Sequence, residues 1–313
     1  MKHDIVTITL NPSIDVTLWV DGLDGDRVNR VQKELRQAGG KGVNVARVTG
    51  DFGLHTRCVV VAGRDNAEEL QSYLMDENLM CEILRVDGAV RENLTLRCDG
   101  ETIKINRQGP ELYSKMGTVL SAWLSERICT DSVVVFAGSL PSGISVRQYA
   151  EMMMAAKTAG ARVAVDTTAL KLADYVRVSP WLIKPNVYEL AELADSPCDT
   201  PEQTLATARM VRERTGIAHV LVSMGSKGLL YCGEGGEYYV QNPAVEVKST
   251  VGAGDSLLAG FIAGVCKELP LTDALRQAVA CGSDCVRHDG TALATRRTMQ
   301  ELLSQVTVLP VKE

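Results

Sequence analysis

The stretch Ser249-Thr250-Val251-Gly252-Ala253-Gly254-Asp255-Ser256 leads directly into an apolar run from Leu257 to Cys266. The run contains no proline and predicts a buried helix with Asp255 in its first turn. Gly252, Ala253 and Gly254 allow a tight turn that exposes N–H groups, and a helix N-terminus attracts anions. A carboxylate there is a candidate base for a hydroxyl that attacks a phosphate. The same residues would also suit a plain glycine turn in which Asp255 caps a core helix.

Composition narrows the possible classes of protein. The chain has 313 residues, 45% of them hydrophobic, which is enough for one large domain or two smaller ones. A formal net charge of −6 argues against a nucleic-acid partner, and no apolar run is long enough to span a membrane or to form a secretory signal. The cysteines number nine, an odd count without a C-x-x-C pair, so they predict reduced thiols in the cytoplasm.

Short β-rich runs alternate with longer helical patterns along most of the chain. This alternation predicts an α/β fold in which helices cover both faces of a mostly parallel sheet. The expected strands are Ile5–Leu10, Cys58–Ala62, Val133–Ala137, Arg162–Asp166, Trp181–Ile183, His219–Ser223 and Gly228–Cys232.

Two regions lack a helical pattern and read as β structure. They are Val16–Arg36 and Arg91–Asn106, and the second contains the hairpin signal Asp99-Gly100. We expect them to form a small β-sheet, inserted into the core as segments spanning about residues 12–43 and 89–109. Such a sheet would act as a lid over a site at the carboxyl ends of the core strands, where open α/β sheets bind ligands.

Polar and glycine-rich motifs follow several of the expected strands. Because the carboxyl ends of parallel strands meet at one edge of a sheet, these motifs predict a shared site. They are Asn11-Pro12-Ser13-Ile14-Asp15, Gly39-Gly40-Lys41-Gly42-Val43-Asn44-Val45-Ala46, Gly138-Ser139-Leu140-Pro141, Lys184-Pro185-Asn186-Val187-Tyr188-Glu189 and Ser223-Met224-Gly225-Ser226-Lys227-Gly228.

With these motifs in this order, the sequence resembles the ribokinase-like (PfkB-type) carbohydrate kinases over nearly its whole length. The stretches 39–46 and 249–256 carry the resemblance most specifically, and the segments after Leu10 and at 138–141 resemble the bacterial sugar-phosphate branch. The resemblance implies one kinase domain over residues 1–313, with a ribokinase-like three-layer α/β/α core and a β-sheet lid. It also implies ATP and Mg²⁺ as cofactors.

The resemblance assigns roles to residues at the reacting end of the site. Asp255 corresponds to the catalytic base, and the N–H groups of Gly252, Ala253 and Gly254 to an anion hole. Asp15 corresponds to a ligand of sugar hydroxyls, and the alternative interpretation of this residue is an Asx turn after Pro12. The remaining residues expected to bind the sugar phosphate are Arg27, Gly39, Gly40, Lys41, Asn44, Arg91, Lys104 and Ser139.

A second group corresponds to the nucleotide site. Asn186 and Glu189 match the element that arranges magnesium around the ATP phosphates, although Asn followed three residues later by Glu is also a capping box. The residues expected near the nucleotide are Lys184, Asn186, Ser223, Gly225, Gly228, Thr250 and Gly282.

The resemblance therefore predicts ATP-dependent phosphorylation of fructose 1-phosphate to fructose 1,6-bisphosphate, with tagatose 6-phosphate and fructose 6-phosphate as alternative acceptors. A sugar-phosphate-binding protein without catalysis is an alternative of another class. A dinucleotide-dependent oxidoreductase is disfavoured because Asn11-Pro12-Ser13, and not G-x-G-x-x-G, follows the first strand.

A β-lid with an exposed face also suggests a homodimer formed through the lid.

Overall fold

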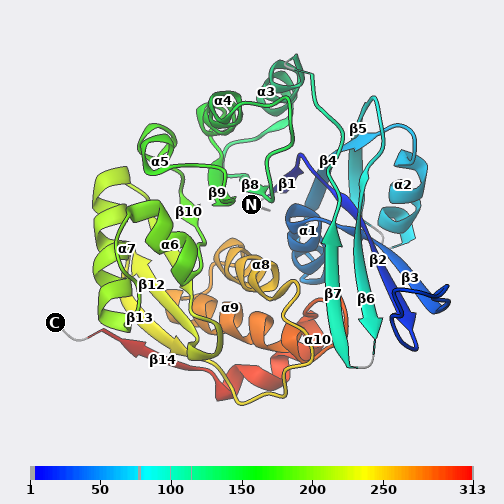
Figure 1. Cartoon of the computed structure of the whole chain (residues 1–313). Coiled ribbons are helices and arrows are strands. Elements are labelled where there is room, and N and C mark those ends of the chain that lie inside the picture. The colour runs from blue at the N-terminus through cyan, green and yellow to red at the C-terminus, as the bar shows by residue number, and fades with distance from the viewer. Residues whose placement is uncertain (1–3, 77–78, 99, 114, 312–313) are drawn as a thin grey trace.

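The computed structural model describes residues 4–76, 79–98, 100–113 and 115–311. Its centre is a ten-stranded sheet in the order β14-β13-β12-β11-β10-β9-β8-β1-β4-β5 (Figure 1). Neighbouring strands are parallel from β5 to β11 and antiparallel from β11 to β14. The strands are β1 (Ile5–Thr9), β4 (Thr56–Gly63), β5 (Met80–Val86), β8 (Val133–Ala137), β9 (Arg162–Asp166), β10 (Leu182–Ile183), β11 (His219–Ser223), β12 (Leu229–Gly233), β13 (Gly236–Gln241) and β14 (Thr307–Pro310).

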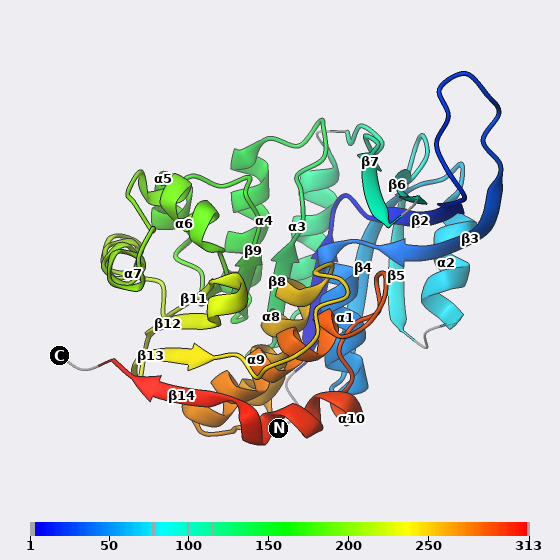
Figure 2. The same cartoon turned by 60° about the horizontal axis from the view of Figure 1, so that its bottom comes forward.

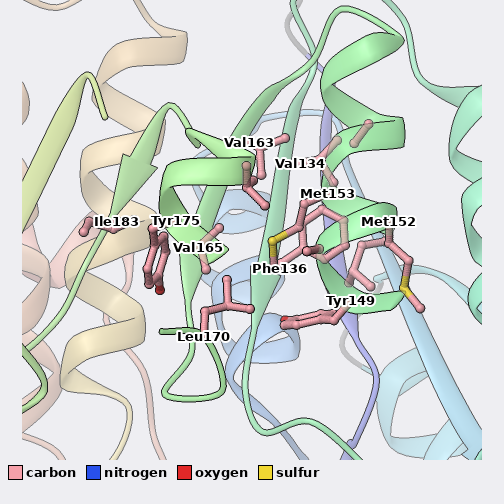
Figure 3. Packing of buried hydrophobic residues seen from close by; sticks show 14 of the residues in the cluster. Val134, Phe136, Tyr149, Met152, Met153, Val163, Val165, Leu170, Tyr175 and Ile183 are labelled. Atoms are coloured by element: carbon pink, nitrogen blue, oxygen red, sulfur yellow. The ribbon is translucent and has the colours of Figure 1, made fainter. Parts of the chain in front are cut away.

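Helices cover both faces of this sheet, which gives the three layers that the sequence predicts. Alternate residues of β8 show why, since Val134 and Phe136 are buried in one hydrophobic cluster while Val133 and Val135 are buried in another. Figure 3 shows part of the first cluster, where Phe136 packs beside Tyr149 and Met153. That face carries α3 (Lys115–Arg127), α4 (Val146–Thr158), α5 (Leu172–Val178), α6 (Val187–Ala194) and α7 (Pro201–Thr215). The other carries α1 (Lys41–Asp51), α2 (Ala67–Asp76), α8 (Ala253–Cys266), α9 (Leu271–Val286) and α10 (Arg296–Met299).

A separate four-stranded sheet stands beside the core, in the order β3-β2-β6-β7 (Figure 1). Its strands are β2 (Ser13–Val20), β3 (Val31–Gly39), β6 (Arg91–Cys98) and β7 (Glu101–Asn106). Two distant segments therefore build one sheet, as the sequence predicts, and β2 and β6 join them in parallel. One face packs against α2 through Ile14, Val16 and Leu70. The hairpin between β6 and β7 is antiparallel as expected, although Asp99 of its turn lies outside the described residues.

The loop from β2 to β3 extends away from both sheets (Figure 2). Within the described part of the chain, no helix is long and apolar enough to cross a membrane.

The structure corrects several boundaries. The sheet contains β5, β13 and β14, which the sequence pattern did not predict, and α1 begins at Lys41, inside the glycine-rich motif at 39–46. The added strands lie at or near the two ends of the sheet, where one face is partly exposed and the apolar pattern is weak. The early start of α1 brings Lys41 and Asn44 onto one helix, which matters for the site.

Candidate active site

The N-terminus of α8 lies at the carboxyl edge of the central sheet and carries Asp255 in its first turn. Gly252 precedes the helix with φ of 79°, a left-handed conformation that favours glycine. A Cβ atom at that position would lie 2.5 Å from Cδ2 of Leu293, so packing also requires glycine here. The first N–H groups of α8 have no carbonyl one turn earlier in the helix to bond, although the N–H of Ala253 donates to the carbonyl of Thr250 over 3.4 Å. Asp255 lies beside them, and only 7% of this residue is exposed.

Asn44 contacts Asp255 directly. Helix α1 packs against α8, and Nδ2 of Asn44 donates to Oδ2 of Asp255 over 2.8 Å. Two glycines position the start of α1: Gly40 has φ of 123°, and a Cβ atom on Gly42 would lie 2.3 Å from Oγ1 of Thr9 at the end of β1. The glycine-rich turn thus lets the helix approach the strand end closely enough for its first turn to reach the site.

A buried carboxylate, Asp166 at the end of β9, lies between two lysines. Nζ of Lys41 is 2.9 Å from Oδ1 of Asp166, and Nζ of Lys184 is 3.4 Å from Oδ2. These cations lower the pKa of the Asp166 carboxyl, mainly through Lys184 and then Lys41, against the opposing effect of burial. In turn, the pKa of Lys41 is raised, because the attraction of Asp166 outweighs the cost of burial.

The pKa of Asp255 shifts in the direction opposite to that of Asp166. Burial, followed by the negative charge of Asp166, raises the pKa of Asp255 to about 6. The hydrogen bond from Asn44 and the charges of Lys41 and Lys184 limit this increase. A carboxyl that titrates near 6 is ionised at neutral pH and still basic enough to take a proton from an alcohol as a reaction proceeds. This is the combination expected of a general base.

Asp15 projects from β2 toward the glycine-rich turn. Its Oδ1 accepts hydrogen bonds from Oγ of Ser13 over 2.8 Å and from Nδ2 of Asn93 over 2.9 Å. A Cβ atom on Gly39 would lie 2.3 Å from Oδ2 of Asp15, so the carboxylate rests against the bare backbone of that glycine. Asp15 is therefore a strand residue held by its neighbours, and the Asx turn considered from the sequence is not the arrangement found.

Arg91 begins the adjacent strand, β6, and both its side chain and that of Asn11 lie against Gly109, where a Cβ atom would be 3.7 Å from Cδ of Arg91 and 2.2 Å from Oδ1 of Asn11. Nδ2 of Asn11 donates to Oγ of Ser139 over 3.0 Å. Burial lowers the pKa of the Arg91 guanidinium and the charge of Asp15 opposes this. Among the described residues, Nε of Arg91, Oδ1 of Asn11 and Oδ1 of Asn93 are buried without a hydrogen-bond partner. Buried polar atoms left unpaired in this way are suited to a polar ligand.

The structure does not bring Arg27 and Lys104 into the same cluster. Arg27 lies in the β2–β3 loop, where its side chain is 83% exposed and 3.4 Å from Asp24. Lys104 is exposed on β7 and pairs in register with Thr95, which in turn pairs with Thr17 of β2. It therefore lies on the same face of the small sheet as Asp15, farther along the strands and two strands away.

A cavity of about 910 Å³ opens on the other side of the α8 N-terminus. Lys184 is not part of its lining but lies beneath the turn, where a Cβ atom on Gly254 would be 3.2 Å from its Nζ. The other residues expected near the nucleotide all line the cavity, together with Ala253 and Gly254: Asn186, Ser223, Gly225, Gly228, Thr250 and Gly282. The volume is within the range of small-molecule sites.

Asn186 and Glu189 form the capping box that the sequence allowed for. Oδ1 of Asn186 accepts from the N–H of Glu189, and Oε2 of Glu189 accepts from the N–H of Asn186, both over 2.9 Å. No group of three or more acidic, histidine or cysteine side chains capable of holding a metal occurs in the described ranges. Asn186 lines this cavity, whereas Glu189 lines a second cavity of about 470 Å³ together with Asp166 and Lys184. A single carboxylate and an amide suit Mg²⁺, which takes few protein ligands and keeps waters and phosphate oxygens.

Sequence reasoning assigned no role to Asp166, Asn93 or Asn11. Asp166 ends a strand that is otherwise apolar at its carboxyl end, and this pattern was a usable signal for a site residue. Asn11 was part of a motif already singled out. Asn93 alternates with leucines on β6, and nothing in the sequence connects it to Asp15, 78 residues away.

Comparison with known proteins identifies related kinases along the whole chain. The sequence model described as pfkB family carbohydrate kinase matches residues 2–298. The 1-phosphofructokinase of Bacillus subtilis is 33% identical over 306 residues, which cover 97% of this chain and 99% of that protein. The tagatose-6-phosphate kinase of Staphylococcus epidermidis is 28% identical over 309 residues, covering 98% of this chain and 100% of the relative.

Solved structures agree with these matches. Phosphofructokinase-2 from Escherichia coli in complex with fructose-6-phosphate superposes with a TM-score of 0.89 and 26% identity, over 97% of this chain and 99% of the other.

Proposed function

The chain belongs to the pfkB family of carbohydrate kinases, and we propose that it phosphorylates fructose 1-phosphate to fructose 1,6-bisphosphate. Members of this family are phosphotransferases that act on a sugar hydroxyl and use ATP as the phosphate donor. The 1-phosphofructokinases at 30–33% identity over nearly the full chain support this acceptor.

The position of Asp255 is the observation on which the proposal depends. On one side, Gly254 and Thr250 line the cavity assigned to the nucleotide. On the other, Asn44 links Asp255 to the turn assigned to the sugar. A base between a triphosphate and an alcohol is the arrangement that in-line phosphoryl transfer requires.

The proposed reaction uses the two oxygens of Asp255 differently. Oδ2 accepts the hydrogen bond from Asn44, which leaves Oδ1 to take the proton of the acceptor hydroxyl. The hydroxyl oxygen then forms a bond to the γ-phosphorus of ATP as the bond to the β-phosphate oxygen breaks. The N–H groups at residues 252–254 stabilise the charge on the phosphoryl group in transfer.

We assign Mg²⁺ to the side of the cavity next to Asn186 and Glu189. When bound, the ion would neutralise charge on the ATP phosphates. Its remaining ligands would be phosphate oxygens and water, which is the coordination that this ion prefers.

We assign the phosphate already on the sugar to Arg91, because it lies near Asp15 and Asn11 and its buried Nε atom has no partner among the described residues. An arginine can bind phosphate through two donors at once. Ser139 and Asn11, which contact one another beside Arg91, complete this part of the pocket. Lys41, held by Asp166, lies close enough to Asp255 to interact with charge on the reacting groups.

Arg27 and Lys104 belong to this site only if the small sheet is completed by a second copy or moves when substrate binds. Large apolar side chains are exposed on this sheet and its loop, among them Val28, Val31, Leu35, Ile103 and Ile105. We therefore propose a homodimer through the small sheet. A cytoplasmic location follows from the use of ATP and of a sugar phosphate.

The proposal is tested by ADP release with ATP, Mg²⁺ and one acceptor at a time. Fructose 1-phosphate should give the largest kcat/KM, ahead of tagatose 6-phosphate and fructose 6-phosphate, with fructose and ribose as unphosphorylated controls. A larger kcat/KM for either hexose 6-phosphate would move the assignment to that acceptor. Binding of fructose 1-phosphate without ADP release would instead identify a non-catalytic sugar-phosphate-binding protein.

A further inference from the structure

Asn44, which contacts the proposed base Asp255, is itself hydrogen-bonded by Arg47. Nδ2 of Asn44 donates to Oδ2 of Asp255 over 2.8 Å, and Nη1 of Arg47 donates to Oδ1 of the same Asn44 over 3.1 Å. Asn44 and Arg47 are three residues apart on α1, so they lie on one face of that helix, one turn apart. The three side chains form a continuous chain of hydrogen bonds along that face of α1, from Arg47 through Asn44 to the base.

The donors and acceptors in this line allow only one orientation of the amide. A guanidinium donates and never accepts, while an ionised carboxylate accepts and never donates. The carbonyl oxygen of Asn44 must therefore face Arg47, and its NH₂ group must face Asp255. Without Arg47, the amide of Asn44 is free to turn its oxygen toward a protonated Asp255, which can donate to it, and this would stabilise the acid form of the carboxyl.

Arg47 does not reach into the reacting site. It lines a cavity of about 590 Å³ with Asp51, His55 and Leu293, and the charges that shift the pKa of Asp255 are those of Asp166, Lys41 and Lys184. Its effect on the base must therefore pass through Asn44. On the basis of the function proposed above, we propose that Arg47 is a positioning residue for the catalytic carboxylate and acts by fixing the amide of Asn44.

The expected consequence is a change in the titration of Asp255. The hydrogen bond from Asn44 lowers the pKa of Asp255, so losing it raises that pKa further above its ordinary value. The other charged and titratable groups that face Asp255 are Lys41 from α1, Asp166 from β9, Lys184 from the segment after β10 and Cys285 from α9. All four are unchanged when Arg47 is replaced.

The test is the pH dependence of kcat/KM for Arg47→Met. The acid limb, where activity falls as Asp255 is protonated, should move upward by roughly one pH unit, and kcat at its plateau should fall roughly tenfold. The KM for ATP should stay within about twofold, because nothing in the nucleotide cavity changes. Arg47→Lys keeps the charge and a donor, and it should restore at least half of the shift.

A double-mutant cycle separates this route from a direct effect of charge. In an Asn44→Ala background, Arg47→Met should leave the acid limb where Asn44→Ala alone has placed it. If the shift persists in that background, Arg47 acts by long-range charge and the proposal is wrong. Arg276→Met is the matched control, because Arg276 has a similar exposure and its partner Asp273 lies on its own helix.

Other outcomes are equally decisive. An unmoved acid limb in a folded Arg47→Met protein would overturn the positioning role while leaving the kinase function intact. If Arg47→Met does not fold, the comparison rests on Arg47→Gln, which removes the charge but keeps a donor, and whose acid limb must lie at a higher pH than that of the wild type. A wild-type protein that releases no ADP with any sugar phosphate contradicts the proposed function itself.

Discussion

Nζ of Lys41 and Oδ1 of Asp166 form an ion pair of 2.9 Å between residues that are 125 positions apart in the sequence. Asp166 is 3% exposed, and Lys184 approaches its other oxygen at 3.4 Å. Two cations thus share one buried anion next to the proposed base. The pair connects the turn that is expected to bind the sugar with the end of β9, which lines a cavity of about 470 Å³ together with Lys184 and Glu189.

Asp166→Asn should move the acid limb of the kcat/KM profile to lower pH and destabilise the fold. The negative charge of Asp166 is one cause of the raised pKa of Asp255, so its removal moves that pKa below about 6. Breaking a buried ion pair leaves Lys41 and Lys184 without their counter-charge, which costs about 3 kcal/mol. The measurements are a pH–rate profile and urea unfolding, with the exposed Glu213→Gln as control. An acid limb that moves to higher pH would show that Asp166 does not act on Asp255 as a like charge.

Asp255→Asn should abolish turnover and stabilise the protein above pH 6. Loss of the base should reduce kcat by at least about a thousandfold. The folded pKa of about 6 is above the unfolded value of about 3.9, so the wild type loses stability as pH rises through this window. The neutral amide avoids that loss, which is on the order of 3 kcal/mol.

The measurement for Asp255→Asn is urea unfolding of both proteins at pH 4 and pH 8. The difference in the free energy of unfolding should be larger at pH 8. Equal differences at the two pH values would mean that the carboxyl of Asp255 is not held at a raised pKa. Near-normal turnover by the variant would refute its role as the base.

The central strands were the most predictable part of the fold. Val133–Ala137 and Arg162–Asp166 match the observed strands at both ends, because they are buried on both faces and read as continuous apolar runs. Met80–Val86 and Thr307–Pro310 are partly exposed edge strands, so their mixed sequences carry no clear period.

The residues of the candidate site also differ in how well the sequence predicts them. Gly252 and Gly40 could be identified from the sequence because each is required by a local backbone conformation. The roles of Asp166 and Asn93 depend on contacts across 125 and 78 residues, which no local pattern encodes. Arg27 was expected in the site from resemblance alone, and in the single chain its exposed side chain contacts Asp24 instead.

Gly39→Ala should weaken binding of the sugar phosphate and leave ATP binding unchanged. The new Cβ atom would lie 2.3 Å from Oδ2 of Asp15, so the carboxylate must move from the place where Ser13 and Asn93 hold it. A displacement of this size should raise the KM for the sugar phosphate more than roughly tenfold. The control is Gly25→Ala, whose Cβ atom would meet nothing within 4 Å. Unchanged sugar KM in Gly39→Ala would remove Asp15 from the proposed sugar site.

Arg91→Met tests the assignment of the acceptor phosphate. The guanidinium of Arg91 is half-buried beside Asp15, and its Nε atom has no partner among the described residues, so a bound phosphate would supply the missing acceptor. Losing a charge-assisted contact of this kind should raise the KM for the sugar phosphate by roughly a hundredfold and leave the KM for ATP within about twofold.

Arg97→Met is the matched control for Arg91→Met. Arg97 lies on the same strand and the same face, six residues farther along, with its guanidinium over the ring of Trp19. A decisive second comparison uses unphosphorylated fructose, which offers no phosphate for Arg91 to bind. The low kcat/KM for fructose should be equal in wild type and Arg91→Met, because only the phosphorylated sugar loses a contact. If ATP affinity falls instead, Arg91 belongs to the nucleotide side of the site and another cation must hold the acceptor phosphate.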